Sequence, residues 1–122
     1  MRLPAFEVIL AAEWARRCAR VPRHLYEPPS PEAVRLALDE ASNEPPDDQP
    51  AATFYALARR PSGIKTAWRL MLALLAKRHA NRCGFELLAS NDELDALRLA
   101  IVVQRLPYEH VRDWFRERLR PL

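Results

Sequence analysis

The chain has 122 residues, of which 49% are apolar and 29% charged, and 19 Lys and Arg against 16 Asp and Glu give a formal net charge of +3. This length and composition favour one soluble globular domain over residues 1–122. Two glycines leave little material for hairpins or glycine-rich phosphate loops, and two distant cysteines exclude a disulfide scaffold.

The basic residues are mostly arginine, with 17 Arg and 2 Lys, and they are spread over the whole chain. A nucleic-acid-binding domain normally concentrates its positive charge in one stripe, so that function is kept only as a second alternative. The N-terminal sequence has no apolar run behind a basic patch, as a signal peptide or membrane anchor would. We therefore expect a cytoplasmic protein with no membrane partner.

The first predicted element is a helix over residues 4–20. Phe6, Leu10 and Trp14 recur every four residues with Ile9 beside them, whereas the charged residues of this segment fall mainly elsewhere. Such spacing is typical of an amphipathic helix that buries its apolar side. The pattern therefore predicts that Phe6, Leu10 and Trp14 face the core.

Two further helices are predicted before the middle of the chain. Ser30 followed by Pro31 is typical of a helix start, with a hydroxyl cap and a proline in the first turn. An acidic, proline-rich loop over residues 43–50 separates this helix from a nearly apolar one over about 50–60. We expect the apolar helix to pack directly on the one that follows it.

The central element is predicted to be a helix over about 66–82. Between Ala67 and Ala76 only Arg69 is polar, so no side of that half is suited to water. A helix that is apolar all round must be enclosed by other elements. Gly84 follows where a left-handed helix stop is expected.

The last part of the chain carries clear boundary signals. After a short extended segment, Ser90 and Glu93 form a capping box that opens a helix ending near Arg105. Pro107 opens the final helix. Its buried stripe is predicted to consist of Val111, Trp114, Phe115 and Leu119. The fold expected is all-α, a compact six-helix bundle around the central helix.

The three histidines form no catalytic or metal-binding group in the sequence. His24 lies in a predicted loop, while His79 and His110 fall on polar helix faces with no carboxylate or cysteine at ligand spacing. We expect each of them to be solvated and expect no metal. Nucleophile elbows, Walker loops and dinucleotide fingerprints are also missing from the sequence.

The N-terminal end of the central helix is the main electrostatic feature. Free backbone N–H groups at such an end attract anions, and Lys65 lies just outside it with Arg69 one turn in. Lys65 and Arg69 are therefore candidates for binding a phosphate or an acidic peptide. The alternative is that Arg69 extends out of an apolar helix into water and that its neighbours are solvated.

The order of elements resembles that of Fic/Doc (Fido-fold) proteins, and most closely the short Doc (death-on-curing) toxins, which pair with Phd antitoxins. One matching stretch is the apolar helix over 51–60, a short turn, and a buried helix ending in Arg82-Cys83-Gly84-Phe85. Residues 88–94, 102–107 and 114–119 are similar to the last two helices of Doc. The resemblance covers nearly the whole chain and implies a Fido-like bundle of toxin–antitoxin type.

In that family the active site is the loop that leads into the central helix. Its motif is His-x-Phe-x-(Asp/Glu)-(Gly/Ala)-Asn-(Lys/Gly)-Arg, in which the His is the general base, the acid holds magnesium, and Asn and Arg bind nucleotide phosphates. Counted back from Gly84, the motif falls on residues 62–70. Its positions are then occupied by Ser62, Ile64, Thr66, Ala67, Trp68, Arg69 and Leu70.

These replacements remove the chemistry that the motif supplies. Ser62 cannot act as a general base without a helper, and Thr66 is a poor substitute for a carboxylate on magnesium. Trp68 and Leu70 stand where the family has Asn and Arg, so the phosphate contacts are lost as well.

The resemblance therefore implies a Doc-like protein with a degenerate active site, acting by binding an antitoxin-like protein or peptide. No cofactor is expected for that function. The first alternative is an active Doc-type toxin that transfers phosphate or AMP to a protein target such as a translation factor, which would require magnesium and ATP. The second is a small nucleic-acid-binding helical domain. The oligomeric state is left open.

Overall fold

The computed structural model describes residues 4–22, 24, 30–60 and 65–122, and six α-helices lie within these ranges. In chain order they are α1 (Ala5–Cys18), α2 (Pro31–Ala41), α3 (Gln49–Ala58), α4 (Lys65–Arg82), α5 (Asn91–Val103) and α6 (Tyr108–Arg118). A 3-10 turn, η2 (Pro46–Asp48), leads into α3, and the short strands β1 (Phe85–Leu87) and β2 (Leu119–Pro121) pair with each other. The all-α, six-helix prediction is confirmed.

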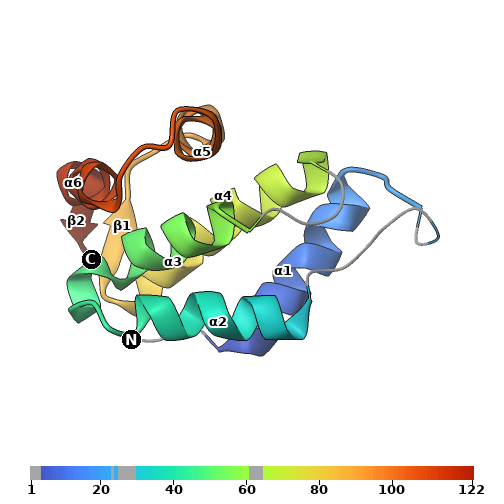
Figure 1. Cartoon of the computed structure of the whole chain (residues 1–122), viewed down its shortest axis with the longest axis horizontal. Coiled ribbons are helices and arrows are strands. Elements are labelled where there is room, and N and C mark those ends of the chain that lie inside the picture. Colours follow the sequence, from blue (N-terminus) through green and yellow to red (C-terminus); the bar gives the residue numbers. More distant parts are fainter. Residues whose placement is uncertain (1–3, 23, 25–29, 61–64) are drawn as a thin grey trace.

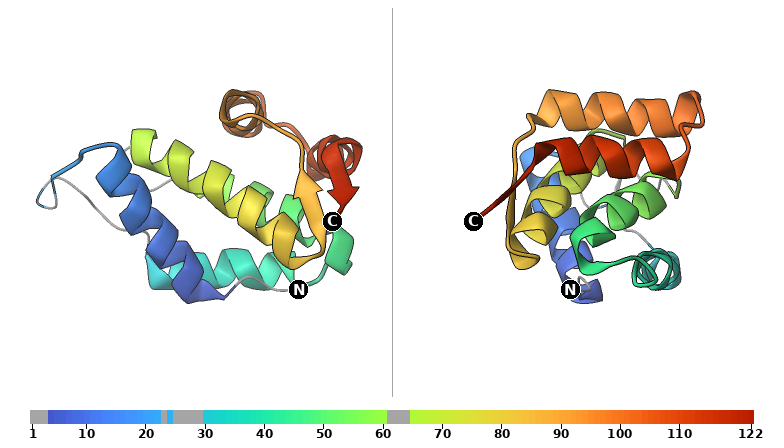
Figure 2. Two further views of the ribbon diagram at one scale, coloured as in Figure 1. Left: turned by 180° about the vertical axis from the view of Figure 1, so that it is seen from behind. Right: turned by 90° about the vertical axis from the view of Figure 1, so that its left-hand side faces the viewer.

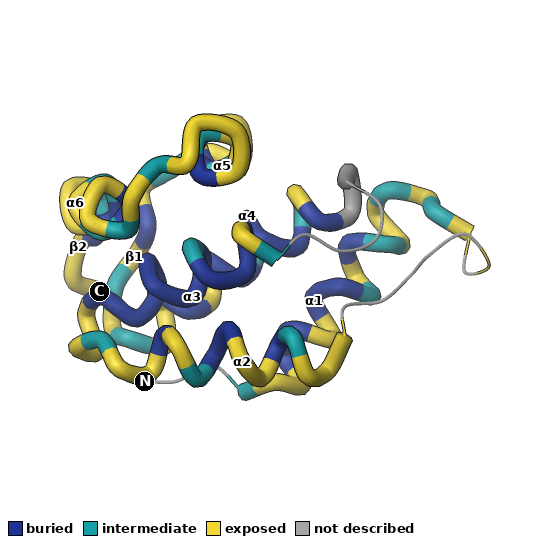
Figure 3. The backbone as a smooth tube through the Cα atoms, in the orientation of Figure 1, coloured by how far each residue is buried: buried dark blue, intermediate teal, exposed yellow. Residues whose placement is uncertain are grey.

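Helices α3 and α4 lie in the middle of the molecule, with α1 and α2 on one side and α5 and α6 on the other (Figures 1 and 2). Helix α4 contacts α1, α3, α5 and β1, while α3 contacts α2, α4, α5 and α6. The tube in Figure 3 is buried along most of these two helices and largely exposed along α5 and α6. This arrangement follows from composition, because the two helices with no polar side must be enclosed.

The buried side chains of α4 hold the two halves of the bundle together. They are Trp68, Met71, Leu72, Ala73, Leu75, Ala76, His79 and Ala80. Beyond the helix, Gly84 adopts a φ of 88°, the left-handed conformation in which a residue without a Cβ is favoured. The predicted helix stop at Gly84 is therefore confirmed.

A two-stranded antiparallel ribbon ties the C-terminal end of the chain to the end of α4. Leu87 pairs with Leu119 and Phe85 with Pro121, and the Leu122 N–H donates to the Gly84 carbonyl at 3.0 Å. Leu119 is buried as predicted, but in a strand, so the prediction that it continues the last helix was wrong. The pairing supplies backbone partners that a three-residue sequence pattern does not reveal.

The predicted helix starts have the expected caps. The Ser90 hydroxyl accepts from the Glu93 N–H at 3.1 Å, and the Glu93 carboxylate accepts from the Ser90 N–H at 3.1 Å, which completes the capping box. At the start of α2, the Ser30 hydroxyl accepts from the Ala33 N–H at 3.4 Å, with Pro31 in the first turn. Local sequence therefore defines these two boundaries.

Helix α1 buries a different face from the one that its large apolar residues predict. Phe6, Leu10 and Trp14 are 60%, 62% and 45% exposed, and Ile9 is exposed beside them. The buried residues of the helix are Glu7, Val8, Ala11, Ala12 and Ala15. The prediction that Phe6, Leu10 and Trp14 face the core was wrong. Small side chains on the buried face let α1 approach α4 closely.

Arg105, which follows α5, has a left-handed φ of 52°. The Leu106 N–H donates to the Ala100 carbonyl at 3.2 Å, as in a helix stop that usually carries glycine. Replacing Arg105 by glycine is therefore expected to raise the free energy of unfolding by about 0.5–1 kcal/mol, because the Cβ strain is removed. Urea denaturation measures the change. As a control, Ala100→Gly inside α5 should lower the same quantity by about 1 kcal/mol; a loss of stability in Arg105→Gly would contradict the strain.

Candidate functional site

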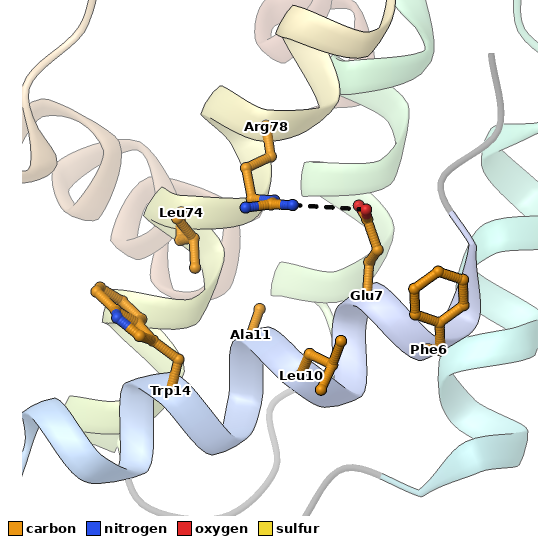
Figure 4. Close-up of a pocket in the computed structure, with 7 residues that line it drawn as sticks. All are labelled: Phe6, Glu7, Leu10, Ala11, Trp14, Leu74 and Arg78. Carbon is orange, nitrogen blue, oxygen red and sulfur yellow. Dashed lines mark ion pairs between the residues drawn. The ribbon is translucent and has the colours of Figure 1, made fainter.

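The exposed side chains of α1 form one wall of a groove against α4 (Figure 4). The groove has a volume of about 400 Å³ and is lined by Phe6, Glu7, Leu10, Ala11, Trp14, Leu74 and Arg78. In Figure 4, Trp14 and Leu74 lie toward one end and Phe6 toward the other, with Glu7 and Arg78 between them. The groove is therefore mostly apolar, with one ion pair inside it.

Helical spacing explains why these side chains lie in one row. Phe6, Leu10 and Trp14 are four residues apart and so share one side of α1, over a length of about 12 Å. Leu74 and Arg78 have the same spacing on α4. We call the row of Phe6, Leu10 and Trp14 the α1 stripe. Large apolar side chains exposed side by side are uncommon on a monomer and are typical of an interaction surface.

Glu7 lies on the inner side of the groove, 7% exposed, and is held by two arginines of α4. The Arg82 Nε donates to the Glu7 Oε2 at 3.1 Å and the Arg82 Nη2 donates to the Oε1. The Arg78 Nη2 lies 3.6 Å from the Oε1. Hydrogen bonding by Arg82 lowers the pKa of Glu7 against the opposing effect of burial, so the carboxylate is ionised at neutral pH.

Positive charge exceeds negative charge at this ion pair, because Arg78, which lines the groove, and Arg82, which does not, both face Glu7. Two guanidinium groups face one carboxylate, and Arg82 already occupies both oxygens of that carboxylate. The side chain of Arg78 is 56% exposed. It therefore presents a cation beside the apolar stripe.

The residues of the degenerate motif lie at the other end of α4. Ser62 and Ile64 fall outside the described residues, and Lys65, Thr66 and Ala67 lie in the first turn of the helix. Trp68 is 5% exposed, and Leu70 is half-buried against the core.

Arg69, a candidate for anion binding, faces a carboxylate of the protein itself. Its Nε lies 3.0 Å from the Asp95 Oδ1 on α5, and Asp95 is also paired with Arg98 at 2.9 Å. The side chain remains exposed at the surface. Any external anion would therefore compete with Asp95 for Arg69.

The burial of Trp68 gives a direct prediction. In a variant that keeps only this tryptophan (Trp14→Phe with Trp114→Phe), we expect iodide to quench the fluorescence weakly, because a 5% exposed indole is shielded from an aqueous ion. The matched variant that keeps only Trp14, which is 45% exposed, should be quenched several-fold more strongly. Equal quenching constants for the two variants would mean that the end of α4 is open to water.

The histidines are not brought together. His24 and His110 are exposed, as predicted. His79 is buried, so the prediction that it is solvated was wrong: it lies on the side of α4 that faces Thr53 and Leu57 of α3. Among the described residues, no group of three or more His, Cys, Asp or Glu side chains is placed to hold a metal ion.

Within the described residues, no helix combines the length and the apolar character needed to cross a membrane. No protein-family model, no curated protein and no solved structure matches this chain. The function is therefore inferred from the groove and its chemistry.

Proposed function

We propose that this protein acts by binding a segment of a partner protein along the groove between α1 and α4. One observation carries the proposal: the α1 stripe leaves three large apolar side chains about half exposed in a groove that also contains Leu74. Covering clustered apolar side chains of this kind with a partner removes them from water and so favours binding.

The free energy available from the stripe is large enough to matter. Complete burial of one large apolar side chain is worth about 1.5–3 kcal/mol. Since Phe6, Leu10 and Trp14 are each about half exposed, covering all three would contribute roughly 2–5 kcal/mol. Such a contribution offsets part of the free-energy cost of association, and polar contacts at the rim would supply more.

The charge and the shape of the groove favour a segment of a different protein as its occupant over a second copy of this chain or a lipid surface. A second copy of this chain would bring two grooves with an excess of positive charge together. A lipid surface is flat and would cover Phe6 and Leu10 without filling the groove of about 400 Å³ between α1 and α4. The side chains of a partner segment can contact both the α1 stripe and the ion pair of Glu7 and Arg78.

The resemblance to Doc gives the proposal its biological context. That resemblance rests on the sequence of the segments that form α4, the turn at Gly84, α5 and α6. We accordingly take the protein to be a Doc-like binding protein with an antitoxin-like partner and without nucleotide transfer. The burial of Trp68 and the pairing of Arg69 with Asp95 support a function that needs neither ATP nor magnesium.

Selection from a displayed library of random peptides on the full chain tests the proposal. We expect the selected peptides to bind at least tenfold more weakly to Leu10→Glu, which places a charge in the α1 stripe. Leu99→Glu is the matched control, because Leu99 is an exposed leucine on α5, and it should leave the affinity unchanged. Circular dichroism confirms that both variants fold.

Four outcomes would overturn the proposal. The first is peptide binding that does not change in Leu10→Glu. The second is dimerisation of the chain, and the third is binding to anionic vesicles, where either one depends on Leu10. The fourth is a rise in thermal stability with ATP and magnesium that Arg69→Ala abolishes, which would favour the active-toxin alternative.

A further inference from the structure

We propose that Arg78 selects partner segments that carry a carboxylate beside their apolar anchors. The inference rests on the function proposed above, since it concerns the same groove. It adds the chemistry of the partner: an acidic segment with large apolar side chains, rather than any apolar segment.

The two arginines that face Glu7 are not equivalent. Arg82 binds both carboxylate oxygens, with its Nε at 3.1 Å from the Oε2, while the nearest nitrogen of Arg78 is 3.6 Å from the Oε1. A separation of 3.6 Å is too long for a strong hydrogen bond. Arg82 therefore makes the close hydrogen bonds to Glu7, whereas Arg78 makes a longer ionic contact with the same carboxylate and keeps a half-exposed guanidinium that a second carboxylate can reach.

Among the residues that the structure describes, the other charged groups near the groove do not supply that second carboxylate. Glu7 is the one carboxylate among the described residues that line the groove. Glu13, further along α1, is paired with Arg16 at 2.7 Å and lies 3.4 Å from Arg17. The excess of positive charge at Arg78 is therefore left for a ligand.

The position of Arg78 makes this charge selective. It lies one helical turn, about 6 Å, from Leu74 on the same side of α4. A partner that packs an apolar side chain on Leu74 brings its next turn or next residues within reach of the guanidinium. An ion pair between arginine and a carboxylate is stronger where apolar neighbours exclude water. A partner that buries the Arg78 guanidinium without giving it a carboxylate would therefore bind more weakly.

Peptide selection on charge variants tests the inference. Selection on the wild-type chain should enrich Asp or Glu at one fixed position relative to the apolar anchors, and selection on Arg78→Glu should enrich Lys or Arg there. Replacing the selected acid by its amide should weaken binding to the wild-type chain about tenfold, since a charged hydrogen bond is lost. The same replacement should have no effect on binding to Arg78→Gln.

Controls separate this inference from the proposed function. Arg35→Glu, an exposed arginine on α2, should leave the acidic preference intact. Arg78→Gln keeps the test valid where Arg78→Glu does not fold. Peptides whose binding depends on Leu10 but that show no acidic preference, or that keep the preference on Arg78→Gln, would overturn the role of Arg78 and leave the groove as the binding site. Peptides that do not depend on Leu10 would overturn the groove itself.

Discussion

Replacing Phe115 by alanine is expected to lower the free energy of unfolding by about 3–5 kcal/mol. Phe115 is 1% exposed, and its ring centroid lies 5.6 Å from that of Phe54 on α3 and 5.4 Å from that of Trp114. Removing the ring leaves a cavity where α6 packs on α3, and a close-packed interior fills such a cavity only in part. Urea denaturation followed by circular dichroism measures the loss.

The matched variant is Phe6→Ala on α1. Because the Phe6 ring is 60% exposed, its removal should change the free energy of unfolding by no more than about 0.5–1 kcal/mol. The pair compares the same chemical change at two positions that the apolar pattern of the sequence treats alike. A loss of unfolding free energy at Phe6 as large as that at Phe115 would show that the α1 stripe is buried in solution. The proposal that the groove binds a partner would then be wrong.

Strong local signals account for the part of the fold that sequence reasoning predicts correctly. The capping box at Ser90 and Glu93, the proline at Pro31 and the stop at Gly84 each act within four residues. The enclosure of α4 follows from a run with one polar residue in ten positions. Such features depend on the chain near them and not on the way distant elements pack.

The face that α1 buries could not be read in the same way. Val8, Ala11, Ala12 and Ala15 also follow helical spacing, so the sequence offers two apolar faces, and the larger residues suggested the wrong one. The deciding contact joins Glu7 to Arg82, which lies 75 residues away. A glutamate inside the small-residue face was the available signal, because a buried carboxylate needs a basic partner.

The groove was not predictable for a related reason. It combines the α1 stripe with Leu74 and Arg78 of α4, and nothing in either helix alone indicates that these side chains meet. The buried position of His79 escaped prediction in the same way, since its surroundings come from α3. The sequence indicates a functional site at the first turn of α4 instead, where the Fic/Doc-like motif falls.

Replacing Glu7 by glutamine is expected to lower the free energy of unfolding by about 1–2 kcal/mol at pH 7. Glutamine has nearly the same shape, but it removes the charge that two arginines share and turns one acceptor into a donor facing Arg82. Breaking a fully buried ion pair costs about 3–5 kcal/mol. A smaller loss is expected here because Arg82 and Arg78 keep part of their contact with water.

The dependence of this loss on pH distinguishes an ionic contact from simple packing. Since the pKa of Glu7 is lowered in the folded state, the unfolded chain takes up the proton first as the pH falls. The contribution of the carboxylate is therefore complete well above about pH 4.3, where an unfolded glutamate titrates, and it disappears as the pH falls through the lower folded pKa. The stability difference between the wild-type chain and Glu7→Gln should accordingly shrink between pH 5 and pH 3.

Urea denaturation at a series of pH values measures this difference, with Glu86→Gln as the control because Glu86 is an exposed glutamate on β1. The control should differ little from the wild-type chain at any pH. A difference for Glu7→Gln that stays constant from pH 7 to pH 3 would mean that charge does not hold α1 against α4. Because the role proposed for Arg78 takes Arg82, and not Arg78, to be the main partner of the Glu7 carboxylate, such a result would also remove that assignment.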